Sequence, residues 1–325
     1  MPLMLTRSDL RPLADDDESL DAAIDAVEQS LLRSHAGEAG EAVFAGLRLA
    51  NGDEFGTCFV ATPTGPASIR LFPHSHGGER RNAWLGVQID GRTGEVASVI
   101  ALDDFNVLRT AVPAAVGVRH LAPAGASTLT VLGSGTQARS HIRTFARVMP
   151  HLKQVRVWSP TKANRERFAA QVAESSGLDV TATDTIESAV DGADVITATG
   201  RTQRGQPALD DPTCVRPGAL FVSMTSSGRN LVPLGARVVM PTERRPELVA
   251  HGYSSGFFRQ PPPPVPPETT QLADVILGAT AARASADETL LYELAAMYLW
   301  DLPIFDWMVR WAVDHGAGTS IDFSS

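Results

Sequence analysis

The segment TVLGSGTQA, at residues 130–138, constrains the fold of this chain more than any other feature. It sets Gly133, Gly135 and Ala138 in the spacing G-x-G-x-x-A, after an apolar run and before a stretch of helical character. In such a strand–turn–helix, the first glycine permits a tight turn, the second lets the backbone approach a pyrophosphate, and the small third residue allows close packing. The helix then offers free N–H groups to the phosphates. The residues predicted to form this nucleotide-binding turn are Gly133, Ser134, Gly135, Thr136, Gln137 and Ala138.

Strands and helices alternate downstream of this turn. Short apolar runs recur, and the stretches between several of them, such as TQARSHIRTFARVM at 136–149, have helical character. Alternation of this kind implies a mostly parallel sheet with helical crossovers. We therefore predict an α/β chain that contains a doubly wound, dinucleotide-binding (Rossmann) domain. The expected strands after the turn are QVRVWS at 154–159, DVTATD at 179–184, DVITATG at 194–200, ALFVSMT at 219–225 and RVVMPT at 237–242.

The first 121 residues follow a different pattern. Residues 17–36 carry apolar side chains at helical spacing behind an acidic start, which predicts a helix. Residues 41–101 are short, partly alternating apolar runs separated by turn-forming residues, which predicts an antiparallel meander. Residues 103–121 look helical again, and Pro113 predicts either a kink or a later start. A second domain is therefore expected, in line with the length of 325 residues.

Composition argues against several classes of protein. The chain has 28 Lys+Arg against 37 Asp+Glu, and a net charge of −9 argues against a general nucleic-acid binder. The two cysteines, Cys58 and Cys214, exclude a zinc ribbon and argue against a disulfide scaffold. There is no uninterrupted apolar run of about 18 residues and no apolar signal core near the N-terminus. We expect a cytoplasmic protein with no metal site and with neither nucleic acid nor membrane as a partner.

The end of the second strand predicts which dinucleotide is bound. An acid that holds the adenosine ribose is typical here, whereas this chain has Ser159, followed by Pro160, Thr161 and Lys162, with Arg165 nearby. Because hydroxyls and cations suit a 2′-phosphate, NADP(H) is favoured over NAD(H). The alternative is that the two cations are only solvated residues at a helix start.

A third group of cofactor residues is expected at the ends of the next strands. The carboxyl ends of strands line the ligand crevice of a doubly wound sheet. The candidates for the nicotinamide side are Thr197, Ala198, Thr199 and Met224. The alternative for the threonines is that they simply suit a strand end.

Several of these motifs together resemble the ornithine cyclodeaminase/mu-crystallin family. The matching segments are LRTAVPAAVGVRHLAP before the glycine turn, IDGRTGEVASVIALDDFNVLRTA, WSPTKANRERFA, RPGALFVSM and the terminal GTSIDF. The second strand and helix are closest to the NADP-using, ketimine reductase-like branch. The resemblance implies a dimerisation and substrate domain at 1–120 and 298–325, a dinucleotide-binding domain at 121–297, and a homodimer. It also implies hydride transfer between a nicotinamide and a C–N carbon.

The resemblance assigns roles to three arginines and a threonine. Arg109, in L-R-T-A, matches the arginine that grips the substrate carboxylate through its planar fork; the alternative is a surface salt bridge. Thr110 matches a neighbour of the cofactor phosphates. Arg70 stands where the family usually has a lysine, and an arginine still binds a carboxylate but is a poor proton donor because it stays charged. Arg48, in GLRLA, matches a further substrate-binding arginine.

Two histidines are candidates for the missing proton donor. His74 and His76 closely follow Arg70, and an ordinary histidine pKa of about 6.5 allows either to supply a proton. We assign the role to His74. The alternative is that both are polar loop residues; as half of a metal site, H-x-H lacks an accompanying acid or cysteine cluster.

The loop after the fifth expected strand distinguishes between cyclodeamination and reduction of an imine, the reactions that the resemblance implies. The family's cyclodeaminases carry an aspartate there that activates the attacking amine or water, whereas residues 221–233, FVSMTSSGRNLVP, contain no acid. We therefore expect an NAD(P)H-dependent oxidoreductase that reduces a C=N bond, or oxidises CH–NH, in an amino-acid-like carboxylate. The alternatives are a cyclodeaminase and a catalytically inactive NADP-binding protein. The proline-rich tract 261–267 is expected to form a surface loop or the edge of a lid, and the sharper alternative is a ligand for a proline-recognition domain. A remodelled lid that includes Phe257 and Phe258 is a separate hypothesis.

Overall fold

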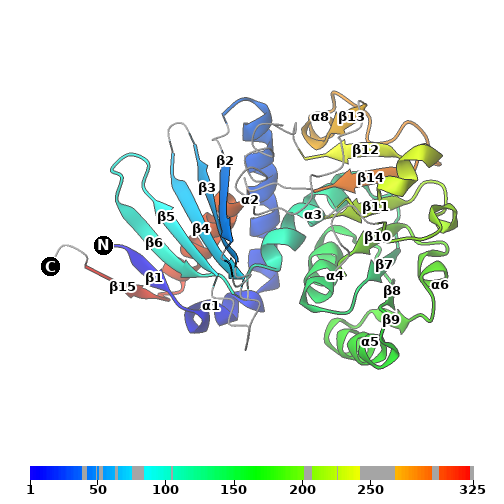
Figure 1. Cartoon of the computed structure of the whole chain (residues 1–325), viewed down its shortest axis with the longest axis horizontal. Coiled ribbons are helices and arrows are strands. Elements are labelled where there is room, and N and C mark those ends of the chain that lie inside the picture. Colours follow the sequence, from blue (N-terminus) through cyan, green and yellow to red (C-terminus); the bar gives the residue numbers. More distant parts are fainter. Residues whose placement is uncertain are drawn as a thin grey trace. The chain divides into compact units, whose positions relative to one another are not determined.

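The computed structural model describes residues 1–38, 42–48, 50, 54–62, 65–74, 84–103, 105–200, 207–224, 226–241, 268–294 and 300–322. These residues form two compact units (Figure 1). The described residues of unit 1 lie within Met1–Arg109 and Ala296–Ser325, and those of unit 2 within Thr110–Arg244 and Pro262–Ala295. The division falls inside helix α3 (Leu108–Leu121). The domain boundary expected at 120/121 lies at the end of the same helix and stays a prediction.

Unit 1 contains a seven-stranded sheet in the order β15-β1-β6-β5-β4-β3-β2. Neighbouring strands from β2 to β6 are antiparallel, so the meander expected at 41–101 is confirmed. Two further strands were missed because three residues and two residues are too short to show a period: β1 runs parallel to β6, and β15 runs antiparallel to β1. The strands are β1 (Leu3–Leu5), β2 (Ala42–Arg48), β3 (Glu54–Ala61), β4 (Ala67–His74), β5 (Leu85–Ile89), β6 (Val96–Ala101) and β15 (Thr319–Ser320).

Three helices complete unit 1: α1 (Arg7–Ala14), α2 (Asp17–His35) and α9 (Asp301–Asp314). Helix α2 begins where the acidic start predicted, because Asp16 accepts a hydrogen bond from the Ser19 N–H as its N-cap. Two tryptophans of α9 join the same end of α2. Trp307 Nε1 donates to Ser19 Oγ at 2.7 Å, and Trp311 Nε1 donates to Asp16 Oδ2 at 3.0 Å. Helix α9, with its two buried tryptophans, is therefore packed against α2 within unit 1.

Unit 2 contains an eight-stranded sheet in the order β13-β12-β14-β11-β10-β7-β8-β9, in which all paired strands are parallel. The strand order reverses beside β7, as in a doubly wound dinucleotide-binding sheet. The predicted fold class is confirmed. The strands are β7 (Thr128–Leu132), β8 (Gln154–Trp158), β9 (Asp179–Ala182), β10 (Val195–Ala198), β11 (Leu220–Ser223), β12 (Arg237–Met240), β13 (Thr269–Gln271) and β14 (Leu290–Glu293).

Strand β14 was not distinguished in the sequence. Its four residues are all buried, and it lies between β11 and β12 although it follows both in the chain. A strand covered on both faces shows no alternation, so its apolar run merges with the apolar segment that continues into α9. Its position matters for the site because it brings Glu293 to the carboxyl edge of the sheet.

The helices of unit 2 are α3 (from Thr110), α4 (Thr136–Val148), α5 (Lys162–Ser176), α6 (Ile186–Val190) and α8 (Leu272–Ile276), with short 3-10 turns η1 (Pro212–Cys214) and η2 (Arg229–Leu234). Helix α3 starts at Leu108, five residues later than the pattern at 103 suggested, and contains Pro113. It approaches β14 closely, since a Cβ on Gly117 would lie 2.1 Å from Tyr292 Cε1.

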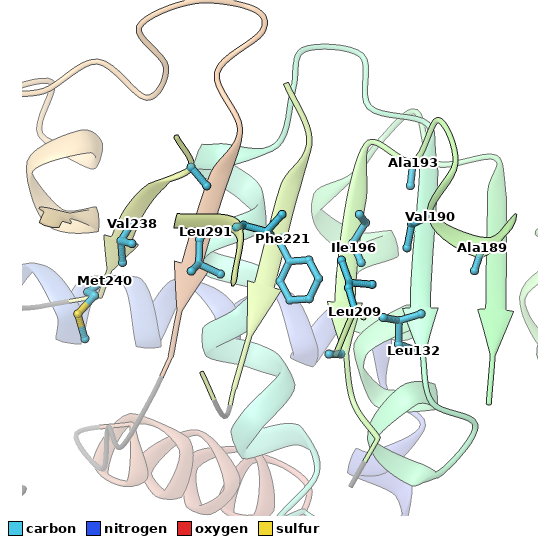
Figure 2. Packing of buried hydrophobic residues seen from close by; sticks show 13 residues of the cluster. Leu132, Ala189, Val190, Ala193, Ile196, Leu209, Phe221, Val238, Met240 and Leu291 are labelled. Carbon is cyan, nitrogen blue, oxygen red and sulfur yellow. The ribbon is translucent and has the colours of Figure 1, made fainter. Parts of the chain in front are cut away.

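The core of unit 2 is a continuous apolar layer on the sheet. Figure 2 shows Phe221 of β11 between Leu291 of β14 and Ile196 of β10, with each of these side chains fully buried. Burial of one such side chain contributes about 1.5–3 kcal/mol to the stability of the folded chain. The layer therefore stabilises the order of the strands, and with it the edge where their carboxyl ends meet. No helix among the described residues is long and apolar enough to cross a membrane.

Candidate functional site

The glycine turn of unit 2 has the geometry that the sequence predicted. Gly133 has a φ of 142°, and a Cβ there would lie 2.5 Å from Thr199 Oγ1, so the turn requires glycine. Gly135 is the N-cap of α4 and provides no side-chain cap, while a Cβ built on it meets nothing within 4 Å. Ala138 is fully buried, which allows α4 to pack closely on the sheet. The turn therefore presents an uncapped helix N-terminus to open space, an arrangement that fits a pyrophosphate.

Among the other residues of the turn, Thr136 is exposed, whereas Ser134 and Gln137 contact neighbouring residues. Thr136 is exposed at the start of α4, and Ser134 Oγ donates to Ser159 Oγ at 2.9 Å across the ends of β7 and β8. The Gln137 carbonyl oxygen contacts His141 Nδ1 at 2.8 Å, while Gln137 Oε1 is buried without a hydrogen-bond partner in the described structure. The predicted turn residues are thus brought together at one edge of the sheet.

The end of β8 places hydroxyls and one exposed cation beside that turn. Ser159 is buried, whereas Pro160, Thr161 and Lys162 are exposed, and Thr161 is the N-cap of α5 without a side-chain cap. Lys162 Nζ lies 3.7 Å from Glu166 Oε1 on the helix surface.

Arg165 is not a solvated residue at the helix start, which was the alternative considered for the two cations after β8. It is 6% exposed, donates to the Ser159 carbonyl oxygen at 3.2 Å and contacts Asp184 Oδ1 at 2.7 Å. The hydrogen bond from Arg165 is the main cause that lowers the pKa of Asp184. Arg165 therefore braces the end of β8.

The candidates for the nicotinamide side end the neighbouring strands. Thr199 Oγ1 lies 3.4 Å from the Leu132 carbonyl oxygen, next to Gly133. Thr197 is completely buried within β10 and Ala198 is 5% exposed, so Thr197 is a core residue of the sheet. Met224 is half-buried directly after β11. Thr110, the first residue of unit 2 in α3, is also half-buried.

Unit 1 contains a buried group of charges that we call the arginine cluster: Arg70, Arg109 and Asp301. Arg70 comes from β4, Arg109 from the first turn of α3, and Asp301 from the start of α9. Arg70 Nε lies 2.9 Å from Asp301 Oδ2, and Arg109 Nε donates to Asp301 Oδ1. Arg70 is 3% exposed and Asp301 is fully buried. Both arginines that the sequence singled out meet at this carboxylate, and Arg109, half-buried, pairs with a buried acid instead of forming a surface salt bridge; their roles in substrate binding stay a prediction.

Two uncharged groups border the arginine cluster. The guanidinium carbon of Arg70 lies 5.6 Å from the centre of the Trp84 ring. Cys58 of β3 faces Arg70 across the ladder, and burial together with Asp301 raises the pKa of its thiol to about 12. Cys58 is therefore a neutral thiol at physiological pH. Asp301 was missed in the sequence, where its one signal is an acid inside an otherwise apolar segment.

The carboxyl edge of unit 2 contains a second buried group, the serine–glutamate cluster: Ser226, Arg229 and Glu293. Ser226 Oγ donates to Glu293 Oε1 at 2.5 Å, and Arg229 Nε donates to Glu293 Oε2. Glu293 is fully buried and Ser226 is 1% exposed. The expected lack of an acid in residues 221–233 holds along the chain, but strand β14 delivers a carboxylate to this loop from 67 residues away.

Ser226 also has an unusual backbone. Its φ is 62°, and among the residues that the structure describes it is the one non-glycine residue with a positive φ. This left-handed conformation costs about 1–2 kcal/mol. A hydrogen bond to a charged group contributes about 1.5–3 kcal/mol. The bond to Glu293 is therefore large enough to offset the strain.

Several residues singled out in the sequence lie partly or wholly outside the described residues. Arg48 ends β2 and His74 ends β4, but the side chains of both lie outside the described residues, as does the whole of His76. The tract 261–267 and Phe257 and Phe258 also lie outside them. Within the described part of the chain, no group of three or more His, Cys, Asp or Glu residues is placed to hold a metal ion.

Comparisons with known proteins show which proteins the chain resembles in sequence and in fold. Ketimine reductase mu-crystallin from Rattus norvegicus is 34% identical over 162 residues, which cover 49% of this chain and 43% of that protein. The match thus spans less than half of the relative. In fold, the chain is similar to the Thermococcus litoralis Δ1-pyrroline-2-carboxylate reductase in complex with NADH and L-proline, with a TM-score of 0.78 and 16% identity over 98% of this chain and 100% of that one. It is equally similar to the iminosuccinate reductase of Paracoccus denitrificans in complex with NAD+, with a TM-score of 0.78 and 20% identity over 99% of both chains.

The model of one protein family covers most of the chain. Residues 74–314 match it, and this range runs from the end of β4 to the end of α9. It includes the glycine turn, Arg109 and Asp301, and the serine–glutamate cluster. The chain belongs to the ornithine cyclodeaminase/mu-crystallin family.

Proposed function

We propose that this protein is an NAD(P)H-dependent oxidoreductase that reduces the C=N bond of an amino-acid-like carboxylate substrate, or oxidises the corresponding CH–NH bond. The observation that carries the proposal is the convergence of Arg70 and Arg109 on one buried carboxylate. Guanidinium groups bind carboxylates through planar, charge-assisted pairs, and we propose that a substrate carboxylate joins Asp301 at these two arginines. The names of relatives support the reaction class: ketimine reductase, pyrroline-2-carboxylate reductase and iminosuccinate reductase.

The residues of unit 2 fit a dinucleotide. The uncapped start of α4 and the open space beside Gly135 would take the pyrophosphate. Thr199 and Met224 would lie toward the nicotinamide, which supplies the hydride when bound. Reduction of an imine also needs one proton at nitrogen. The arginines stay protonated and Cys58 is a neutral thiol of high pKa, so we keep His74 as the proposed donor.

Steady-state assays test the reaction directly. NADPH and NADH consumption is measured against cyclic ketimine carboxylates and against 2-oxo acids with and without amines. We expect turnover on a ketimine carboxylate, and we expect Arg109→Ala to abolish it while NADPH binding survives. Arg167→Ala, an exposed arginine of α5 that contacts Asn164, is the matched control and should leave turnover unchanged. Cofactor binding without turnover on any substrate would favour a catalytically inactive NADP-binding protein.

NADP(H) is the proposed cofactor. Ser159, Thr161 and Lys162 would face the 2′-phosphate, with Lys162 as its cationic partner, since Arg165 is engaged by Asp184. We expect tighter binding of NADPH than of NADH, and a loss of that preference in Lys162→Ala. Titration of both cofactors into Lys162→Ala and into Arg167→Ala measures it; equal effects of the two substitutions would contradict the assignment.

A cyclodeaminase is the second candidate function, and Glu293 is the observation that favours it. A carboxylate next to Ser226 restores an acid to the loop that lacks one along the chain. The assay is conversion of ornithine or lysine to the cyclic amino acid with release of ammonia, in the presence of NAD+. Ammonia release without net change in cofactor absorbance would favour this reaction over the reductase.

Self-association through unit 1 is also proposed. Phe55 and Phe59 on β3 and Leu71 on β4 are 48%, 44% and 42% exposed, and they share one face of the sheet because residue 57 pairs with residue 71. Covering large apolar side chains is a common reason for dimer formation. Sedimentation analysis should show a homodimer that Phe59→Lys weakens; a monomer in both would refute this proposal. The cytoplasmic location stays a prediction.

A further inference from the structure

Glu293 and Ser226 lie at the part of the sheet edge that a dinucleotide reaches with its nicotinamide end. The glycine turn follows β7, and the adenosine end lies over β8 in sheets of this type. The other end of the ligand must then extend over β10 and β11. Ser226 closely follows β11, two strands away from β7, and this distance is about 10 Å at the usual spacing between strands.

A hydrogen bond from Ser226 to Glu293 helps to hold the shape of this turn. A non-glycine residue with a φ of 62° is strained, and here the Ser226 hydroxyl is tied to the fully buried Glu293. In this bond the Ser226 hydroxyl donates and Glu293 Oε1 accepts. The turn is braced further by the Ser227 N–H, which donates to Ser223 Oγ at 2.8 Å at the end of β11.

A purely stabilising role explains this arrangement poorly. Burying a carboxylate is expensive, and an apolar side chain at the end of β14 would be at least as stabilising as a buried charge pair. Strained backbone that is held by its surroundings is concentrated at ligand sites. Both features occur here at the carboxyl edge of the sheet.

We propose that Glu293 is a positioning residue that acts through Ser226: it holds the 226–229 turn in its left-handed conformation and so shapes the surface against which nicotinamide and substrate meet. The inference rests on the proposed oxidoreductase function. In this proposal the backbone conformation of residue 226 affects the reaction. The Ser226 hydroxyl matters only because it holds that conformation.

Two substitutions at one position test this. Ser226→Ala and Ser226→Gly both remove the hydroxyl, but only glycine adopts the left-handed conformation without strain. We expect kcat to fall about tenfold in Ser226→Ala, the change that a barrier difference of about 1.4 kcal/mol produces, and to stay close to wild type in Ser226→Gly. Affinity for NADPH should be unchanged in both. Ser175→Ala is the control, since it also removes a serine hydroxyl of unit 2, one that donates to the Val172 carbonyl oxygen within α5 and is not part of this turn.

A second readout is independent of activity. Hydrogen exchange of the peptide that spans residues 220–234 should be faster in Ser226→Ala than in Ser226→Gly or wild type, because the alanine turn loses its conformation. Glu293→Leu, which removes the acceptor of the Ser226 hydrogen bond, should behave like Ser226→Ala in this measurement. If hydrogen exchange differs between the variants as expected but no substrate is turned over, the role of Glu293 in holding the conformation of residue 226 stands. The proposed oxidoreductase function is then refuted. Equal loss of kcat in the alanine and glycine variants, or no loss in either, would overturn the positioning role.

Discussion

The arginine cluster of unit 1 and the serine–glutamate cluster of unit 2 both bury one carboxylate, but they surround it differently. Asp301 contacts the Nε atoms of two arginines, whereas Glu293 contacts one arginine and one serine hydroxyl. The first arrangement gathers cationic donors from two elements, β4 and α3, which suits an anionic ligand. The second ties a strained turn to the sheet. In unit 1 the buried acid holds side chains that can bind a ligand, whereas in unit 2 the buried acid holds a backbone turn in place.

The largest expected effect comes from removing the acid of the arginine cluster. Asp301→Ala leaves a buried and a half-buried guanidinium group without the carboxylate between them, and breaking a buried ion pair from one side costs about 3–5 kcal/mol. Urea unfolding of unit 1, followed by the fluorescence of its tryptophans, measures the loss. A loss below about 1 kcal/mol, the value typical of exposed pairs, would contradict the view that this cluster is shielded from solvent.

A buried histidine of unit 2 makes a pH-dependent contribution to stability. His141 of α4 is fully buried, and burial lowers its pKa from 6.5 to about 4. The unfolded chain takes up this proton below about pH 6.5 while the folded chain does not, so the stability present above pH 6.5 is lost as the pH falls toward 4. The shift corresponds to about 3 kcal/mol. Urea titrations at pH 7 and pH 4.5 should show this loss in wild type and a smaller one in His141→Phe.

The acid of the serine–glutamate cluster should contribute less to stability than Asp301. In Glu293→Gln the amide oxygen still accepts from Ser226, and the change weakens mainly the bond from Arg229, worth about 1.5–3 kcal/mol for a charged partner. The free energy of unfolding of unit 2, followed by circular dichroism, provides the measurement. A loss as large as that of Asp301→Ala would remove the contrast between the two clusters.

The smallest effect is expected at a second acid on the same helix as Asp301. Asp306 accepts a hydrogen bond from Gln88 Nε2 at 2.6 Å, and burial raises its pKa, so its charged form is disfavoured in the folded protein. Asp306→Asn removes that charge and should change stability by about 1 kcal/mol or less. The same denaturation experiment serves as the control for Asp301. Equal losses at the two positions would mean that helix α9 is sensitive to any change of charge, whatever its partner.

Local patterns were sufficient for most of the fold. The glycine turn, the strand–helix alternation and the antiparallel meander each depend on residues close together in the sequence, and all three are confirmed. The short strands β1 and β15 and the fully buried β14 were missed, because a period cannot be recognised in two or three residues or in a run that is apolar on both faces.

The sequence by itself determined the doubly wound fold, the cofactor turn at Gly133 and the choice of Arg70 and Arg109 as candidate residues. Only the tertiary structure decided which acids meet these elements. Asp301 joins Arg109 across 192 residues, and Glu293 joins Ser226 across 67, because the insertion of β14 and the return of α9 bring distant segments together. Local sequence specifies turns and periods through neighbouring residues, whereas the partners of buried charges are set by strand order and packing, which are properties of the whole chain.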